Sequence, residues 1–352
     1  YHPDLHGKDC GEMIVKRQER FIKIKTSYEY LFLKLQKDKP QIQENKASQK
    51  IKKPKIIAVG GAKGGIGKSV FASNLSVYLA KRGFDTVAAD LDLGGSNLHL
   101  FLGKTSIRKN INDYLSNNVS NLGDILENTN YGPRLMGGNS SKLGTANISF
   151  TQKLKLLKAI RNIEADYVVM DLGGDTSYNV LDFFLAADTG IVMTTCDPAS
   201  YLDAYSFIKV SLYRKLNRLF GPESMDAGKT DNILKNLIHE TTMSKDNPLV
   251  GDIEGLIRKI RKDHPNSMNT IKKVLSDFVP QLIVNKVINE KSALGPVKRI
   301  QEVSQKKLSI DVGYLCSLPF QSQIEKSART LVPWISEMSD EKLIKKMDAV
   351  TR

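Results

Sequence analysis

Cysteine is scarce in this sequence. Only three of the 352 residues are cysteines, and Cys10, Cys196 and Cys316 lie far apart without a C-x-x-C pair. This excludes a disulfide framework and the usual zinc or iron–sulfur spacings, and it is typical of proteins in a reducing cytosol. We therefore expect a cytoplasmic protein, with a peripheral place at the membrane left open.

Long hydrophobic segments are also missing. No apolar run is long enough to span a bilayer, and there is no signal-peptide pattern. Hydrophobic residues nevertheless make up 41% of the chain, which is enough for a buried core. The first residue is Tyr1 rather than Met, so we expect the natural chain to begin further upstream.

The net charge of +14 is unevenly distributed. Residues 1–55 contain 14 Lys or Arg and 7 Asp or Glu, so half of the excess lies in this short segment. The remaining charge is mild for its length, which weakens the inference of a nucleic-acid-binding surface over the whole protein.

Apolar segments alternate with helical patterns from Lys55 onward. This order favours an α/β fold with a parallel, doubly wound sheet covered by helices on both faces. Residues 221–279 interrupt the rhythm with polar, helix-prone sequence, so we interpret them as a helical insertion within a domain at 55–352. The predicted strands are 55–61, 85–90, 166–174, 189–198, 280–287 and 312–319, and the clearest predicted helices are 69–83, which Gly83 would end, and 151–165.

A glycine-rich loop follows the first predicted strand. The stretch "GGAKGGIGKS" at 60–69 fits G-x-x-x-x-G-K-[ST] except that Ala62 replaces the first glycine. Between a strand and a helix such a loop binds phosphate, because its backbone N–H groups and the helix N-terminus converge on the anion. Lys68 would reach the β- and γ-phosphates, and the Ser69 hydroxyl would bind Mg²⁺. The expected nucleotide contacts are Gly64, Gly65, Ile66, Gly67, Lys68, Ser69 and Val70.

The pattern K-G-G-x-G-K-[ST] resembles the deviant Walker A motif of the MinD/ParA family of P-loop ATPases. The resemblance implies ATP and Mg²⁺ as cofactors and an ATP-dependent homodimer. It also implies that Lys63 crosses the dimer interface to the partner's nucleotide, where a cation would neutralise the charge that develops during phosphoryl transfer.

Further segments resemble the same family across 55–335. "AADLDLGG" resembles switch I, which implies that Asp90 holds a Mg²⁺-bound water and that Asp92 orients or activates the attacking water. "DYVVMDLGGDTS" resembles Walker B and switch II, with Asp171 beside the metal. The resemblance places Asn285 and Pro319 at the adenine, although Asn285 could instead be a turn residue.

Two further resemblances concern the branch of the family and the N-terminal segment. "DLDLGGSNLHLFLG" is most similar to the FlhG-like, flagellar-number branch. Residues 1–37 resemble part of a J-domain, in which His2-Pro3-Asp4 would stimulate a DnaK-type chaperone before a helix with an apolar stripe. Residues 38–54 are polar and basic, which indicates a flexible linker.

We predict a slow ATPase whose dimerisation positions or recruits an unidentified partner protein. A nucleotide-dependent or chaperone-linked binding module with vestigial hydrolysis remains an alternative. An assembly or metabolic enzyme on this scaffold would need clustered cysteines, and a tyrosine autokinase would need a C-terminal tyrosine cluster, which the last 35 residues lack.

Membrane and DNA are less favoured partners. The C-terminal stretch "LVPWISEMSDEKLIKKMDAVTR" is amphipathic but interrupted by acidic residues, so we expect a packed helix rather than a membrane anchor. The basic run "IRKIRK" at 257–262 would suit nonspecific DNA, yet such a run is more often a solvated helix face.

Overall fold

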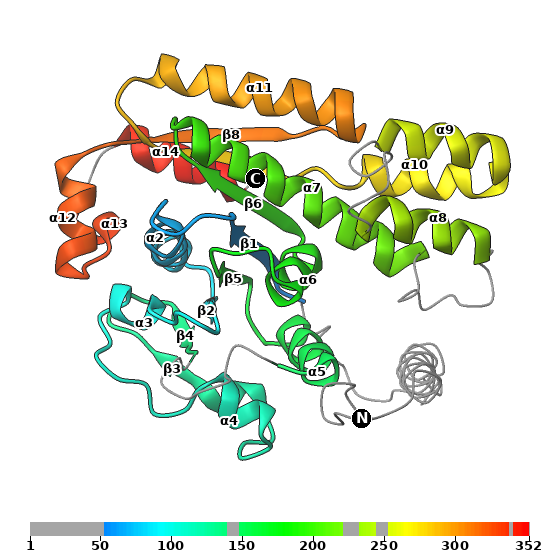
Figure 1. The fold of residues 1–352 in the computed structure, drawn as a ribbon. Coiled ribbons are helices and arrows are strands. Elements are labelled where there is room, and N and C mark those ends of the chain that lie inside the picture. The colour runs from blue at the N-terminus through cyan, green and yellow to red at the C-terminus, as the bar shows by residue number, and fades with distance from the viewer. Residues whose placement is uncertain (1–52, 139–147, 221–231, 244–252, 338–340, 352) are drawn as a thin grey trace, which may run out of the picture. The chain divides into compact units, whose positions relative to one another are not determined.

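The computed structural model describes residues 53–138, 148–220, 232–243, 253–337 and 341–351 (Figure 1). These residues fall into two compact units. One contains 53–212 with 272–351, and the other contains 213–271. The J-domain-like segment at 1–37, with His2-Pro3-Asp4, and nearly all of the predicted linker at 38–54 lie outside the described residues.

The larger unit is built on an eight-stranded sheet with the order β3-β4-β2-β5-β1-β6-β7-β8. All neighbouring strands are parallel except β3 and β4, so the predicted α/β class with a mostly parallel sheet is confirmed. The strands are β1 (Lys55–Gly60), β2 (Thr86–Leu91), β3 (Leu126–Asn128), β4 (Arg134–Met136), β5 (Tyr167–Leu172), β6 (Thr189–Thr194), β7 (Gln281–Val287) and β8 (Gly313–Pro319).

The helices follow the strands in the expected alternation. In the larger unit they are α2 (Lys68–Lys81), α3 (Leu98–Phe101), α4 (Ile111–Leu115), η2 (Leu122–Ile125), α5 (Phe150–Arg161), α6 (Tyr178–Ala186), α11 (Glu290–Leu308), α12 (Ser322–Thr330), α13 (Trp334–Glu337) and α14 (Glu341–Thr351). Helix α7 (Pro198–Phe220) begins in this unit, and α10 (Met268–Ser276) ends in it. The smaller unit contains α8 (Asn232–Met243), α9 (Ile253–Asp263) and η3 (Pro265–Ser267).

Helices cover both faces of the sheet, because successive strand side chains point to opposite sides. On one face, Ile57 and Val59 of β1 share a buried cluster with residues of α2, α13 and α14. On the other, Phe184 of α6 and Phe207 of α7 meet edge to face, 5.0 Å between ring centroids, against Gly60.

The C-terminal segment is packed, as predicted. Leu343, Met347 and Val350 of α14 are buried in the same cluster as α2. Hydrogen bonds add to this packing: the Asn74 side chain accepts from the Ile335 N–H at 3.0 Å, and the Lys81 ammonium donates to the Ile335 carbonyl at 3.0 Å. Within the described part of the chain, no helix is long and apolar enough to cross a membrane.

Candidate nucleotide site

The glycine-rich loop joins β1 to α2 in the conformation that its sequence favours. Gly65 and Gly67 adopt positive φ angles of 75° and 97°, and Gly67 is the residue that precedes the first turn of α2. A Cβ on Gly67 would lie 2.4 Å from the Asn285 side-chain nitrogen, so a larger residue here would displace the Asn285 side chain and strain the left-handed backbone. The loop leads directly into the N-terminus of a 14-residue helix. Helix N-termini of this kind commonly bind anions in proteins.

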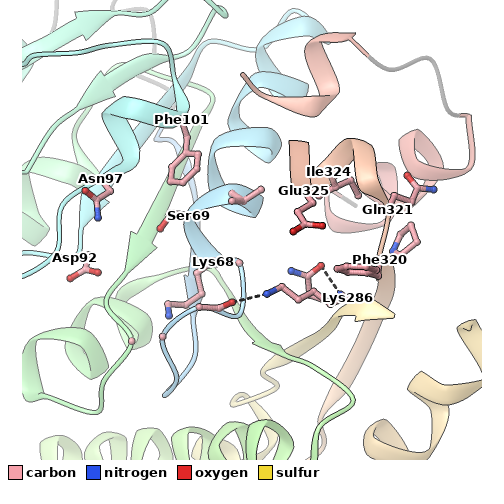
Figure 2. A pocket seen from close by; sticks show the side chains of 17 residues that line it. Lys68, Ser69, Asp92, Asn97, Phe101, Lys286, Phe320, Gln321, Ile324 and Glu325 are labelled. Carbon is pink, nitrogen blue, oxygen red and sulfur yellow. Dashed lines mark hydrogen bonds between the residues drawn. The ribbon is translucent and has the colours of Figure 1, made fainter. Parts of the chain in front are cut away.

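A pocket of about 500 Å³ opens beside this loop (Figure 2). Its wall is formed by the β1–α2 loop and the start of α2, the segments at the ends of β2, β5, β7 and β8, the residue before α3 and the last residue of α3, and the start of α12. Because the carboxyl ends of parallel strands meet at one edge of a sheet, segments distant in sequence converge here. The pocket is lined by Gly64, Gly65, Gly67, Lys68, Ser69, Val70, Asp92, Asn97, Phe101, Gly174, Asn285, Lys286, Pro319, Phe320, Gln321, Ile324 and Glu325.

Lys68 is the buried cation of the pocket. Its ammonium donates to the Lys63 carbonyl at 2.9 Å, and the residue is only 8% exposed. Burial lowers the pKa of Lys68, while the carboxylates of Asp171, Asp92 and Asp175 act in the opposite direction. A desolvated ammonium held among carboxylates is well placed to bind a polyanion.

Asp90 and Asp171 lie side by side on the neighbouring strands β2 and β5. Asp90 accepts hydrogen bonds from the Ser96 hydroxyl at 2.5 Å and from the Leu98 N–H at 3.0 Å, whereas Asp171 bonds with Ser69. Burial raises the pKa of Asp90 to about 6, and burial together with the charge of Asp90 raises the pKa of Asp171 well above its usual range.

One oxygen of each of these carboxyl groups, Oδ1, is buried without a hydrogen-bond partner among the described residues. Buried acceptors of this kind are uncommon, because an unsatisfied polar atom is costly. Two such oxygens beside the Ser69 hydroxyl fit a hard cation such as Mg²⁺ or its bound water. The residues present therefore suit the expected metal.

Asp92 follows β2 and faces the segment after β5. Its carboxylate accepts from the Gly95 N–H at 3.0 Å. A Cβ on Gly173 would lie 3.3 Å from the Asp92 carboxylate, and one on Gly174 would lie 3.1 Å from both the Gly64 nitrogen and the Lys68 ammonium. The two glycines thus allow the chain after β5 to approach the phosphate loop closely.

Asn285 and Lys286 bind carbonyl groups of the phosphate loop. The Asn285 side-chain amide donates to the Ile66 carbonyl at 2.8 Å. The Lys286 ammonium donates to the Gly65 carbonyl at 3.0 Å (Figure 2). The resemblance to the MinD/ParA family predicts that Asn285 contacts the adenine. Asn285 lines the pocket, but in this structure its amide nitrogen binds the loop, so adenine recognition by this residue stays a prediction.

Most of the predicted contact residues gather in this pocket. Ser69, Val70 and Pro319 line it together with the three loop glycines, Lys68, Asp92 and Asn285. Ile66 is buried at 5% exposure and can contribute only through its backbone. The Lys63 carbonyl accepts a hydrogen bond from the Lys68 ammonium. The contact of the Lys63 ammonium with the nucleotide of a second chain stays a prediction.

Sequence reasoning missed the far wall of the pocket. Phe101 of α3 and Phe320 after β8 lie on either side of the opening, and Glu325 of α12 points into it (Figure 2). Phe320 is 54% exposed, which is unusual for a large apolar side chain. Phe320 could have been predicted from the sequence, because it directly follows Pro319 at the end of a strand. Lys286 could have been predicted in the same way, because it directly follows Asn285.

These features define a P-loop nucleotide-binding domain, and the comparisons identify its family. Residues 57–333 match the profile of the CobQ/CobB/MinD/ParA nucleotide binding domain. This match covers most of the chain, so the protein belongs to that family.

Individual relatives are more distant. The chain is 31% identical to the flagellum site-determining protein YlxH of Helicobacter pylori over 46% of this chain and 55% of the relative. It is 33% identical to the tyrosine-protein kinase CpsD of Streptococcus agalactiae over 42% of this chain and 60% of the relative. The matched region thus spans only about half to three fifths of these relatives.

The fold has solved counterparts. The septum site-determining protein MinD of Pyrococcus horikoshii, determined with Mg-ADP, superimposes with a TM-score of 0.56 at 17% identity. The superposition covers 85% of this chain and 96% of that chain. At this identity the similarity shows the fold alone.

Proposed function

We propose that this protein binds ATP with Mg²⁺ in the pocket beside 60–69 and hydrolyses it slowly to ADP and phosphate. The observation that carries the proposal is the convergence of Lys68, Ser69 and three carboxyl groups on one glycine-rich loop at the N-terminus of α2. The family's nucleotide-binding description and the Mg-ADP bound to MinD of P. horikoshii support the same ligand.

Each residue has a role that follows from its position. The loop N–H groups and Lys68 bind the phosphates, and the Ser69 hydroxyl with the free oxygens of Asp90 and Asp171 would hold the metal or its water. The metal, when bound, supplies charge neutralisation at the phosphates. Asp92 lines the pocket, where it orients or activates a water for attack.

The proposed cellular role is a switch. Two chains join face to face around Mg-ATP, Lys63 of each reaches the other's nucleotide, and hydrolysis separates them. In this way binding and dimerisation become one coupled event that recruits or positions a partner protein. The similarity to YlxH supports a flagellar-regulator-like role, while a binding module with vestigial hydrolysis is the second candidate.

Phosphate release and light scattering test this proposal together. The wild-type protein is expected to release phosphate slowly in Mg-ATP. The Asp92→Ala variant, in which hydrolysis is blocked, is expected to double in mass in Mg-ATP. In the Asp92→Ala background, Lys63→Ala is expected to remain monomeric, whereas the exposed-lysine control Lys298→Ala should dimerise normally. Equal phosphate release by wild type and Asp92→Ala would select the vestigial module. A monomer under every condition would refute the switch.

A further inference from the structure

Strand β7 does not end as a regular strand. Lys286 has a left-handed backbone with φ of 58°, and the pairing of β7 with β8 shifts register between Val284 and Val287. In a regular strand, adjacent side chains point to opposite faces. At this irregularity the side chains of Asn285 and Lys286 instead both reach the phosphate loop.

The left-handed residue is an unusual choice. A left-handed backbone suits glycine or asparagine far better than lysine. The turn is stabilised locally, because the Lys286 N–H donates to the Asn285 side-chain oxygen at 2.9 Å. The long side chain of Lys286 then extends back along the pocket to the Gly65 carbonyl (Figure 2). A shorter residue would satisfy the backbone better but could not make this contact.

These two contacts determine how two peptide groups of the loop are oriented. A trans peptide is planar, with its C=O and N–H pointing in opposite directions. The Gly65 carbonyl belongs to the peptide whose N–H is on Ile66, and the Ile66 carbonyl to the peptide whose N–H is on Gly67. Binding both carbonyls therefore fixes the direction of both N–H groups, which point away from Asn285 and Lys286. A loop that cradles phosphate needs its N–H groups held in fixed directions of this kind.

A cation has a second effect at this position. An ammonium that binds a carbonyl oxygen polarises the whole peptide group, which makes the N–H at its other end a stronger donor. Lys286 thus differs from Asn285, which offers only a neutral donor. The proposed nucleotide function assigns no role to this lysine, although it lines the pocket.

We infer that Lys286 is a positioning residue for phosphate binding. It holds the 65–66 peptide so that its N–H faces the nucleotide's polyphosphate, and it sets affinity rather than the rate of the chemical step. This inference rests on the proposed nucleotide function and adds to it a residue outside the Walker motifs.

Three substitutions separate the cation from the backbone that carries it. Lys286→Asn keeps a residue that tolerates the left-handed conformation but removes the ammonium. Lys286→Arg keeps a cation of similar reach. Lys298→Gln is the matched control, because Lys298 is an exposed lysine on α11, 78% exposed, and pairs with Glu302 at 3.8 Å. Lys286→Gly replaces the Asn variant if circular dichroism shows that the latter does not fold.

Titration calorimetry with Mg-ADP and Mg-ATP gives the primary result. Loss of a charge-assisted hydrogen bond predicts a Kd about tenfold higher for both nucleotides in Lys286→Asn. In steady-state hydrolysis, KM should rise in parallel while kcat at saturation stays within about twofold. Lys286→Arg should recover most of the affinity, and Lys298→Gln should match wild type.

Each other outcome overturns the inference. An unchanged Kd in Lys286→Asn shows that the loop is held without the lysine. A fall in kcat at unchanged Kd shows that Lys286 acts on the chemical step. Failure of Lys286→Arg to recover affinity, when the protein is folded, shows that the cation is not what matters. If wild type binds neither nucleotide, the proposed function fails first, and that result is recognised before any variant is compared.

Discussion

Asp90 and Asp171 occupy the same register on the adjacent strands β2 and β5, and both are buried, at 0% and 1% exposure. Ser96, Leu98 and Ser69 satisfy part of their hydrogen-bonding capacity, but one oxygen of each remains without a partner among the described residues. Two carboxyl groups in this arrangement repel each other when ionised. A cation bound between the two carboxylates would reduce this electrostatic repulsion.

The first prediction concerns this repulsion. Asp171→Asn removes a buried carboxyl group whose ionisation is disfavoured, at nearly constant shape, so the free energy of unfolding in Mg²⁺-free buffer at pH 8 should rise by about 1–3 kcal/mol. The same variant should lose the extra stabilisation that Mg²⁺ gives in the presence of ADP. Urea denaturation with and without Mg-ADP measures both effects. A variant less stable than wild type without Mg²⁺ would show that the carboxylates do not oppose each other.

The second prediction concerns another buried carboxylate, for which the change in the free energy of unfolding has the opposite sign. Asp182 of α6 is fully buried and forms an ion pair with Lys153 of α5, which is itself only 6% exposed. Asp182→Asn removes this buried negative charge from beside the ammonium, so it should destabilise the protein by about 3–5 kcal/mol. Urea denaturation under the same conditions gives the comparison. The double variant Asp182→Leu, Lys153→Met should recover much of the loss, and if it does not, packing rather than charge accounts for the effect.

The sequence allowed the near wall of the site to be predicted because its signals are local. Lys68 and Ser69 belong to one loop motif, and Asp90, Asp92 and Asp171 follow apolar strands whose carboxyl ends meet at one edge of a parallel sheet. The strands β1, β2, β5, β6, β7 and β8 were found for the same reason, since short continuous apolar runs identify buried strands.

What could not be predicted depends on tertiary structure. β3 and β4 have only three residues each, too few to show a period, and β3 is antiparallel to β4. The left-handed backbone of Lys286 has no sequence signal, because lysine rarely adopts it. Phe101 reaches the pocket because the short helix α3 lies beside the phosphate loop, a placement that no local pattern specifies.

The third prediction tests the close approach of Asn285 to the loop. Gly67→Ala places a Cβ 2.4 Å from the Asn285 side-chain nitrogen at a φ of 97°, so the Asn285 side chain must move away and the backbone of the loop is strained. A left-handed alanine alone costs about 1–2 kcal/mol, and we expect nucleotide affinity to fall by more than about tenfold. Titration calorimetry with Mg-ADP measures the change.

The matched control for that variant is Gly123→Ala. Gly123 is an exposed glycine in η2, and an added Cβ there would meet only Asn121 at ordinary contact distances from 3.4 Å. Its nucleotide affinity should equal that of wild type. If Gly67→Ala binds as well as the control, the loop accommodates a side chain and the Asn285 contact does not restrict it.

The last prediction concerns the attachment of the C-terminal helix. The Tyr78 hydroxyl of α2 donates to the Asp348 carboxylate of α14, and Tyr78 is only 4% exposed. Burial, with a smaller contribution from this hydrogen bond, raises the pKa of Tyr78 to about 12. The folded protein therefore keeps the tyrosine proton between about pH 10 and 12, where the unfolded chain loses it. This contribution to stability is complete below pH 10 and disappears as the pH rises to 12.

Tyr78→Phe lacks the ionisable hydroxyl. Its free energy of unfolding should be lower than that of wild type by about 1 kcal/mol at pH 8 and should fall less steeply between pH 10 and 12, as measured by urea denaturation across the range. Parallel curves for the two proteins above pH 10 would contradict the assignment, because Tyr114 and Tyr205, whose pKa values are also raised, are present in both.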